Sequence, residues 1–265
     1  MRPFRPKPNA GAPPFLVAHR GVPSKAPENT LASFLLAFDH PKIDMIELDV
    51  HLSKEEEVIV LHDRTLQRTS TGNGAARGYA VEELKRFDAG SWFDVKFSSE
   101  RIPTLGEVLT RARGVCWVNI ELKSHLCYRE PKGLLEHRVM ESVRSNGMES
   151  AVMFSSFDHR LISSLKSLYP QASVGVLYNF YRDFGKLPSE LARNANAEIF
   201  VCGKNELSNR MLRDAKANGI ALYLYTVNSI ADARAALELG VDGIISDNAD
   251  EIIPLIEVQD RVTHR

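Results

Sequence analysis

The sequence predicts an α/β protein built as a (β/α)8 barrel, the TIM-barrel architecture. From residue 115 onward, short apolar runs alternate with amphipathic helical patterns, and most of these helical patterns end before Gly or Pro. Together with two apolar runs before residue 64, the chain shows eight strand-like runs, each followed by a helical pattern. Eight such units in about 250 residues are typical of this barrel. A doubly wound open sheet is the alternative, but the chain lacks the G-x-G-x-x-G or P-loop motif that would favour it.

The first strand is predicted at residues 15–19, where Phe-Leu-Val-Ala-His forms a short apolar run. Pro23 and Pro27 keep the following loop extended, because proline fixes the φ angle. Thr30 is suited to begin a helix, since its side-chain oxygen can accept a hydrogen bond from the backbone. This helix is expected to place four apolar residues on one face: Leu31, Phe34, Leu35 and Phe38.

A strand, a charged turn and a returning strand follow at residues 45–63. Side chains two apart on a strand share a face, so Glu47 and Asp49 point the same way. Two carboxylates side by side in a buried sheet repel each other unless a cation lies between them. An oxygen-seeking ion such as Mg²⁺ or Ca²⁺ meets that need. The same period can bring His62, on the returning strand, to the same rim. For the two carboxylates alone, an edge strand with a solvated acidic face is the alternative.

Residues 64–105 break the alternation of strands and helices. Residues 69–75 are rich in turn-forming types, residues 81–87 suit a short helix, and Ser91-Trp92-Phe93 suits an aromatic anchor. A structureless loop of this length is unusual inside a compact domain. We therefore predict a small folded insertion or lid after the second strand, covering part of the barrel mouth.

The alternation resumes with a helix from Leu105. Further strands are predicted at residues 115–123, 151–155, 173–178, 198–202, 221–227 and 243–246. Helices are predicted at residues 134–145, 160–168, 189–194, 209–217, 230–239 and 249–258. We predict a flexible Pro-rich leader at residues 1–13 and a single barrel domain at 14–265, with the insertion at about 64–105.

Composition limits the classes of partner. The 265 residues are 44% hydrophobic and 25% charged, which is ordinary for a soluble globular protein. Lys and Arg number 33 against 34 Asp and Glu, so no field of one sign suggests nucleic acid or an anionic membrane surface as partner. If the substrate is anionic, positive charge for it must be placed locally. The oligomeric state is left open, with a homo-oligomer among the options.

Cysteine usage and the leader bear on the compartment. Cys116, Cys127 and Cys202 are widely spaced and odd in number, which argues against a disulfide framework or a thiolate zinc site. The leader has no apolar h-region, so it does not read as a secretory signal. No apolar run approaches the length of a membrane span. We expect a cytoplasmic protein without a membrane span.

Polar residues gather where the predicted strands end, which is where barrel enzymes place their active sites. These residues are His19-Arg20, Glu47-x-Asp49, Glu121-x-Lys123, Ser155-Ser156, Tyr225-Thr226-x-Asn228 and Ser246-Asp247. Each has a structural alternative: Glu121 and Lys123 can form an ion pair at the barrel mouth, and Ser155-Ser156 can cap the next helix. Together, three carboxylates, two histidines, an Arg and a Lys on one rim indicate a metal-assisted phosphoryl site.

The same residues carry a resemblance to a known family. The chain strongly resembles the glycerophosphodiester phosphodiesterases, and the likeness covers essentially everything after residue 14. Its motifs are His19-Arg20-Gly21, Pro27-Glu28-Asn29-Thr30, Glu47-Leu48-Asp49, His62-Asp63, Arg68-Thr69-x-x-Gly72-x-Gly74, Ala89-Gly90-Ser91-Trp92-Phe93, Ile102-Pro103-Thr104-Leu105 and Glu121-x-Lys123. This family has a TIM barrel with an insertion after the second strand.

The resemblance implies a role for each matching residue. Glu47, Asp49 and Glu121 would bind one divalent metal ion, Mg²⁺ or Ca²⁺. His19 and His62 would be the acid/base pair, with Arg20 and Lys123 on the phosphate. The reaction implied is metal-dependent hydrolysis of glycerophosphodiesters, such as glycerophosphocholine or glycerophosphoethanolamine, to glycerol 3-phosphate and an alcohol. Which histidine is the acid and which is the base stays open.

The chain departs from the family pattern in three places. A Lys-Asp-Gly turn is common where this chain has residues 54–57, Lys-Glu-Glu-Glu. Tyr225 stands where the family usually has Trp, on the substrate-headgroup side. After the last strand, Asp247-Asn248-Ala249 replaces the usual Asp-x-Pro. Two alternatives remain: a lysophospholipase D, which would need an apolar groove for the acyl chain, and a non-catalytic relative that binds metal or phosphate.

Overall fold

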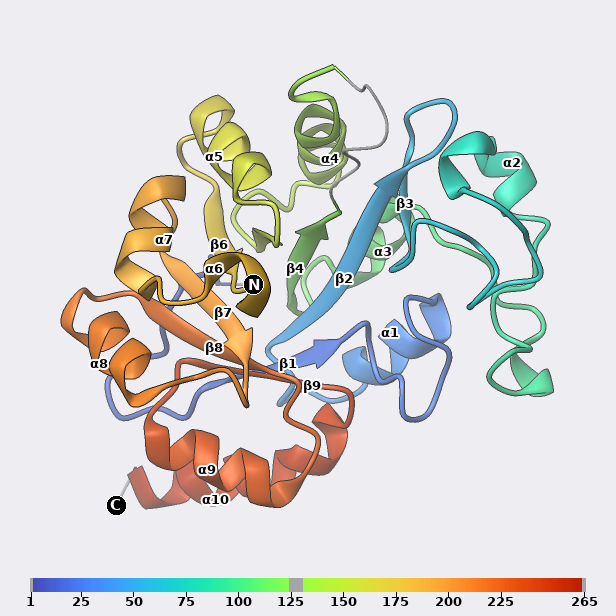
Figure 1. The fold of residues 1–265 in the computed structure, drawn as a ribbon. Helices are drawn as coiled ribbons and strands as arrows, with labels where there is room; N and C mark the ends of the chain where they lie inside the picture. The colour runs from blue at the N-terminus through green and yellow to red at the C-terminus, as the bar shows by residue number, and fades with distance from the viewer. Residues whose placement is uncertain (1, 124–130, 264–265) are drawn as a thin grey trace.

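The computed structural model describes residues 2–123 and 131–263; residues 1, 124–130 and 264–265, including Cys127, lie outside the description. Within the described ranges, eight parallel strands form a closed barrel (Figure 1). β1 (Phe15–His19) pairs with both β2 (Met45–Leu52) and β9 (Gly243–Ser246), and these pairings close the sheet. The predicted TIM barrel is confirmed, and the open-sheet alternative is wrong.

The remaining barrel strands lie at the predicted places. They are β4 (Trp117–Leu122), β5 (Val152–Ser156), β6 (Ser173–Leu177), β7 (Ile199–Gly203) and β8 (Ala221–Tyr225). Each strand is a short run of largely buried apolar residues, as parallel strands covered on both faces require. On β2, Ile46 and Leu48 are fully buried and alternate with the two carboxylates of the site. Cys116 and Cys202 are buried free thiols.

Helices surround the barrel (Figure 1). They are α1 (Leu31–Phe38), α3 (Leu105–Ala112), α4 (Leu134–Ser145), α5 (His159–Leu168), α7 (Pro188–Ala195), α8 (Asn209–Ala217), α9 (Ile230–Leu239) and α10 (Ala249–Thr263). Several begin at a residue whose side-chain oxygen accepts a backbone hydrogen bond of the first turn. Among these residues are Thr30, Thr104, Asp158, Ser208 and Ser229.

Three local expectations differ from the structure. Leu35 is 47% exposed, while Phe34 and Ala37 are buried. Successive helix residues are about 100° apart, so Leu35 lies well away from the buried stripe. Asp158 caps α5 instead of the Ser155-Ser156 pair, whose hydroxyls donate to Asn119 and to the Leu122 carbonyl. A short helix, α6 (Phe180–Asp183), lies between the strand predicted to end at residue 178 and the helix predicted to begin at residue 189, where no element is predicted.

The break in the alternation corresponds to a small folded insertion. β3 (Val58–Val60) returns antiparallel to β2, and η1 (Ala76–Gly78), α2 (Val81–Leu84) and η2 (Val95–Phe97) follow. Figure 1 shows α2 beyond β3, at the edge of the molecule. These segments share a hydrophobic cluster of their own: Ile59, Leu61, Leu66, Ala76, Leu84, Ala89 and Ile102. The segment therefore has a packed core, but α2 ends three residues before the predicted position 87.

A substitution of Trp92 tests whether the insertion acts on substrate selection or on the stability of the fold. The Trp92 side chain is 43% exposed, and its contacts include a hydrogen bond to the Ala89 carbonyl and the Phe93 ring. Because little packing depends on it, Trp92→Ala should change KM or substrate preference more than the melting temperature. Leu84→Ala is the control, since removing a fully buried leucine costs about 2–5 kcal/mol. Global unfolding of the Trp92 variant would show instead that this ring is part of the core.

The leader contacts the barrel. The Trp117 indole donates a 2.8 Å hydrogen bond to the Arg2 carbonyl, and its ring lies 5.4 Å from that of Phe4. The Tyr223 hydroxyl donates to the Pro6 carbonyl at 3.1 Å. These contacts tie residues 2–6 to strands β4 and β8, whereas the sequence predicts a flexible leader. Separately, no helix within the described residues is long and apolar enough to cross a membrane.

Candidate active site

Three buried carboxylates meet inside the barrel. Glu47 and Asp49 lie on β2, and the strand register places Asp49 beside Glu121 on β4. One oxygen from each of the three lies within 4.8 Å of the others. The strand period that aligns Glu47 with Asp49, and the pairing of β2 with β4, therefore bring together the three residues that the sequence singles out.

The electrostatics of this acidic cluster favour a bound cation. Glu47 Oε2 accepts a 3.1 Å hydrogen bond from the Arg20 backbone, but its Oε1 is buried without a hydrogen-bond partner in the described residues. Burial and the charge of Asp49 raise the pKa of Glu47 to about 8. Burial likewise raises the pKa of Glu121. Excess negative charge on oxygen donors alone fits a hard divalent ion such as Mg²⁺ or Ca²⁺.

Two basic side chains contact the carboxylates. Lys123 Nζ hydrogen-bonds Glu121 and lies 2.7 Å from Asp49 Oδ1. Arg20 Nε lies 3.2 Å from Asp49 Oδ2. Burial opposes ionisation of Asp49, yet Lys123 and Arg20 hold its pKa well below the usual range. The local positive charge that an anionic substrate would require is therefore present beside the acidic cluster.

His19 lies at the end of β1, paired in register with Glu47. Its Nδ1 is 2.6 Å from Asp247 Oδ1, and its Nε2 is 3.9 Å from Glu47 Oε2. Burial lowers the pKa of His19, but the hydrogen bond to Asp247 and the charge of Glu47 outweigh it and leave the pKa raised. Because Asp247 holds Nδ1, the Nε2 atom is left to exchange a proton.

His62 follows β3 and has an equivalent arrangement. Its Nδ1 lies 2.6 Å from Asp63 Oδ1, and a third of its side chain is exposed. Burial lowers the pKa of His62, and the nearby charges of Lys123 and Arg20 lower it further against the attraction of Asp49. Both histidines therefore have one nitrogen held by an aspartate, with their pKa values shifted in opposite directions.

Comparison with known proteins decides the family. A family model described as the glycerophosphoryl diester phosphodiesterase family matches residues 19–251. This chain belongs to that family. It is therefore an enzyme, a glycerophosphodiester phosphodiesterase, as the sequence resemblance implies.

Individual relatives agree over nearly the full chain. The glycerophosphodiester phosphodiesterase of Caldanaerobacter subterraneus is 34% identical over 91% of this chain and 97% of its own length. That of Bacillus altitudinis is 33% identical, covering 91% and 98% respectively. A phosphodiesterase structure from Oleispira antarctica, in complex with the product sn-glycerol-3-phosphate, has a TM-score of 0.84 at 28% identity and covers 92% and 97%. The Agrobacterium tumefaciens glycerophosphodiester phosphodiesterase has a TM-score of 0.79 at 29% identity, covering 91% and 99%.

Several phosphodiesterase residues that touch the site were given no role by the sequence. Asn29 Nδ2 donates a 2.8 Å hydrogen bond to Asp49 Oδ2. Asn228 Nδ2 donates at 2.7 Å to the free oxygen of Asp247, the partner of His19. Glu28 accepts from Arg20 at 2.9 Å. The family motifs and strand ends contain all of these residues, but their partners lie 8, 19 or 20 residues away on other loops or strands, so no strand or helix period could assign them.

Tyr225, the residue that replaces the family's usual Trp, lies at the end of β8. Its ring meets that of Phe157 edge to face at 6.3 Å, and its hydroxyl is 3.5 Å from the Tyr178 carbonyl. Burial raises the pKa of Tyr225. The surroundings of the candidate residue Tyr225 are therefore aromatic, in contrast to the charged groups on β2 and β4.

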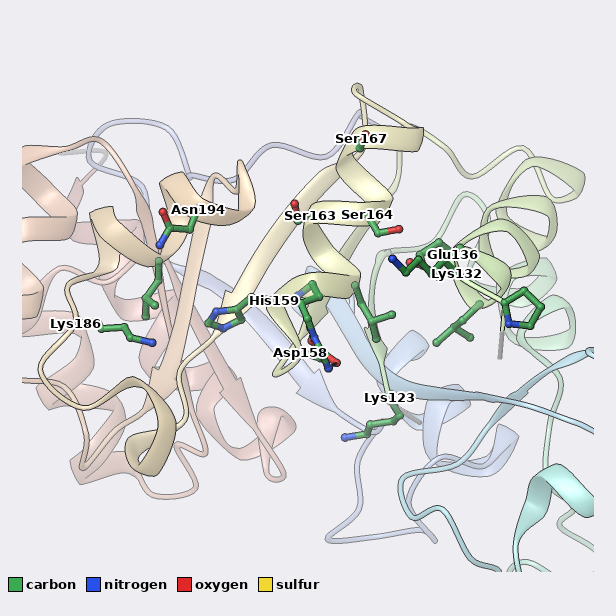
Figure 2. A pocket seen from close by; sticks show the side chains of 16 residues that line it. Lys123, Lys132, Glu136, Asp158, His159, Ser163, Ser164, Ser167, Lys186 and Asn194 are labelled. Carbon is green, nitrogen blue, oxygen red and sulfur yellow. Dashed lines mark hydrogen bonds and ion pairs between the residues drawn. The ribbon is translucent and has the colours of Figure 1, made fainter. Parts of the chain in front are cut away.

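A cavity of about 950 Å³ opens between α4, α5 and α7 (Figure 2). Its lining is mixed: polar side chains such as Asp158, His159 and Lys186, labelled in Figure 2, lie beside the apolar Leu161 and Leu191. Of the candidate site residues, Lys123 alone lines it. Residues 131–133 also line it, and they follow directly on residues 124–130, which lie outside the description, so we assign no ligand to this cavity.

Proposed function

We propose that this phosphodiesterase hydrolyses glycerophosphodiesters such as glycerophosphocholine and glycerophosphoethanolamine to glycerol 3-phosphate and an alcohol, using Mg²⁺ or Ca²⁺. The observation that carries the proposal is the meeting of three buried carboxylates with two aspartate-held histidines at the ends of the strands. The Oleispira antarctica relative, whose structure contains sn-glycerol-3-phosphate, supports the same glycerol-phosphate side of the reaction.

Glu47, Asp49 and Glu121 would hold the metal ion. The fit rests on the buried Glu47 oxygen without a partner and on the all-oxygen donor set. When bound, the ion supplies charge neutralisation at a non-bridging phosphate oxygen. Asn29 helps to fix the orientation of Asp49 through the 2.8 Å hydrogen bond to Oδ2, while Lys123 contacts Oδ1.

Arg20 and Lys123 would bind the phosphate of the substrate. A phosphodiester is an anion that repels nucleophiles, and both cations already lie at the carboxylate cluster. Arg20 is held by Glu28 as well, so its guanidinium has a fixed direction. Tyr225, with Phe157, would contact the substrate on the aromatic side of the site.

The reaction divides into two steps with balanced proton movements. In the first step the 2-hydroxyl of the glycerol forms a bond to phosphorus, the bond to the headgroup oxygen breaks, and a cyclic phosphate results. One histidine accepts the hydroxyl proton and the other donates a proton to the leaving oxygen. In the second step water opens the ring with the two roles reversed, giving glycerol 3-phosphate. General acid/base catalysis of this kind contributes about 10²–10⁴-fold per group.

Each histidine should be essential to this reaction. His19→Ala and His62→Ala should each lower kcat by at least about 10²-fold with the fold intact, because each removes one proton transfer. The comparison needs kcat across pH together with circular dichroism. His137→Ala is the matched control, since that imidazole lies on α4 and its Nδ1 pairs with the Tyr169 hydroxyl. Near-normal kcat at every pH in either variant would assign that histidine a structural role.

A turnover assay with three diesters tests the proposed function. The enzyme should release glycerol 3-phosphate from glycerophosphocholine and glycerophosphoethanolamine, as measured by phosphorus NMR. Lysophosphatidylcholine serves as the third substrate, because preferred turnover of it to lysophosphatidic acid would favour the lysophospholipase D alternative. If the protein binds these compounds without cleaving any of them, the proposal is wrong and the non-catalytic alternative holds.

A further inference from the structure

Arg68, from the insertion, lies between two carboxylates of the catalytic region. Its Nε and Nη2 atoms donate to Asp63 at 2.7 and 3.1 Å. Its Nη1 and Nη2 atoms donate to Glu28, each at 2.8 Å. A guanidinium has five N–H donors, and this geometry uses four of them. Arg68 is therefore committed to the protein and is not arranged to bind a phosphate.

Each carboxylate that Arg68 holds also contacts a residue of the proposed chemistry. Asp63 Oδ1 lies 2.6 Å from His62 Nδ1. Glu28 Oε1 accepts from Arg20 Nη1 at 2.9 Å. The contacts form one continuous series of side chains. In order, these are His62, Asp63, Arg68, Glu28 and Arg20. The series connects the histidine after β3 to the arginine after β1.

A second anchor holds each carboxylate in one orientation toward its partner. Asp63 is the residue next to His62, so the same short stretch of backbone carries both groups. The hydrogen bonds from Arg68 lower the pKa of Asp63 to about 2, which keeps it an anion facing Nδ1. A carboxylate that is itself held in place sets the orientation of the imidazole it contacts. Asn228 does the same for Asp247 and His19, but from the barrel instead of the insertion.

The contribution of Arg68 to stability is expected to be small. Its side chain is 43% exposed, and ion pairs of exposed groups contribute about 0–1 kcal/mol. Its four hydrogen bonds lie in the guanidinium plane on two sides, and they instead fix the orientation of the Asp63 and Glu28 carboxylates. A lysine could not reproduce them, because an ammonium has three donors and no fork.

We propose that Arg68 is a positioning residue that orients His62 through Asp63 and Arg20 through Glu28. This inference rests on the proposed function, in which His62 transfers a proton and Arg20 binds phosphate. The inference gives the insertion a defined part in the reaction, because the insertion carries Arg68, the side chain that couples His62 to Arg20.

The test compares Arg68→Gln with a matched variant, Arg138→Gln. Arg138 also joins two carboxylates, Glu56 and Glu141, and its side chain is 40% exposed. In the described residues, however, neither of these carboxylates contacts His62 or Arg20, whereas both carboxylates held by Arg68 do. Arg68→Gln should lower kcat for glycerophosphocholine by about 10–100-fold, the usual effect of losing an outer-shell partner. Arg138→Gln should leave kcat within about threefold, and the two variants should have similar melting temperatures. Arg68→Lys should recover only part of the loss.

A second readout does not depend on turnover. The ¹⁵N chemical shifts of the His62 ring report its tautomer, and they should change in Arg68→Gln but not in Arg138→Gln. Asp63→Asn combined with Arg68→Gln should lose less than the product of the single losses, because both act on the same imidazole. Equal kcat in the Arg68 and Arg138 variants, or an unchanged His62 spectrum, would overturn the proposal. An inactive wild-type enzyme with the expected His62 change would instead count against the proposed function alone.

Discussion

Removing the metal should reduce hydrolysis of glycerophosphocholine by about 10³-fold or more, since a Lewis acid contributes several kcal/mol and each 1.4 kcal/mol is tenfold in rate. Adding Mg²⁺ or Ca²⁺ should restore the activity. Glu47, Asp49 and Glu121 would otherwise be three carboxylates within 4.8 Å of one another, beside a phosphodiester anion. Activity should be followed after exhaustive chelation and dialysis, with each metal then added back.

Glu121→Gln should reproduce the effect of chelation. The substitution keeps the shape of the side chain and removes one ligand charge. Of the two carboxylates that contact Lys123, only Asp49 then remains charged. Metal content should fall together with kcat. Glu136→Gln is the control, because that glutamate on α4 is also buried, at 2% exposed, and lies outside the acidic cluster. A Glu121 variant with full metal content and full activity would remove this residue from the ligand set.

The second large effect concerns the nucleophile. A 2-deoxy analogue of glycerophosphocholine should be hydrolysed orders of magnitude more slowly at saturation, because an intramolecular hydroxyl can reach effective molarities of about 10⁵ M or more. Loss of a single hydrogen bond would cost only about 1 kcal/mol, or roughly fivefold. The size of the change therefore distinguishes attack by the substrate hydroxyl from attack by water.

The comparison needs kcat as well as KM, since weak binding of the analogue alone would imitate a slow reaction. Bis(p-nitrophenyl) phosphate is a useful companion substrate: it has a better leaving group but no neighbouring hydroxyl, and should also react slowly. Turnover of the deoxy analogue within about tenfold of the natural diester would mean that water attacks phosphorus directly.

Much of the fold could be predicted because each strand of the barrel corresponds to a local pattern in the sequence. Short apolar runs that end at polar residues predict buried parallel strands, and their alternation with helical patterns predicts the barrel. It is harder to predict from sequence which residues of a single helix face the core. Leu35 is apolar yet 47% exposed, because Phe34 and Ala37 define the stripe that faces the core.

The acidic cluster could be predicted for the same local reason. Glu47 and Asp49 are two apart on one strand, and Glu121 ends a predicted strand of its own. The partner that holds His19 depends instead on tertiary structure. His19 and Asp247 are 228 residues apart in sequence, and only closure of the barrel between β1 and β9 places them in contact.

The insertion shows the same limit. Its existence follows from the interrupted alternation, and its hydrophobic cluster explains why it is folded. Its link to the site does not follow from any period in the sequence. Arg68 meets Glu28, 40 residues away, only because the segment after β3 folds back beside the loop after β1.

The measurement that tests the central claim most directly is a metal titration of the chelated enzyme during hydrolysis of glycerophosphocholine. Phosphorus NMR would follow glycerol 3-phosphate while calorimetry follows binding of Mg²⁺ or Ca²⁺. We predict that activity rises with metal and saturates at one equivalent per chain, and that Glu121→Gln loses both binding and activity. Full hydrolysis before any metal is added, or binding that leaves the rate unchanged, would contradict the account.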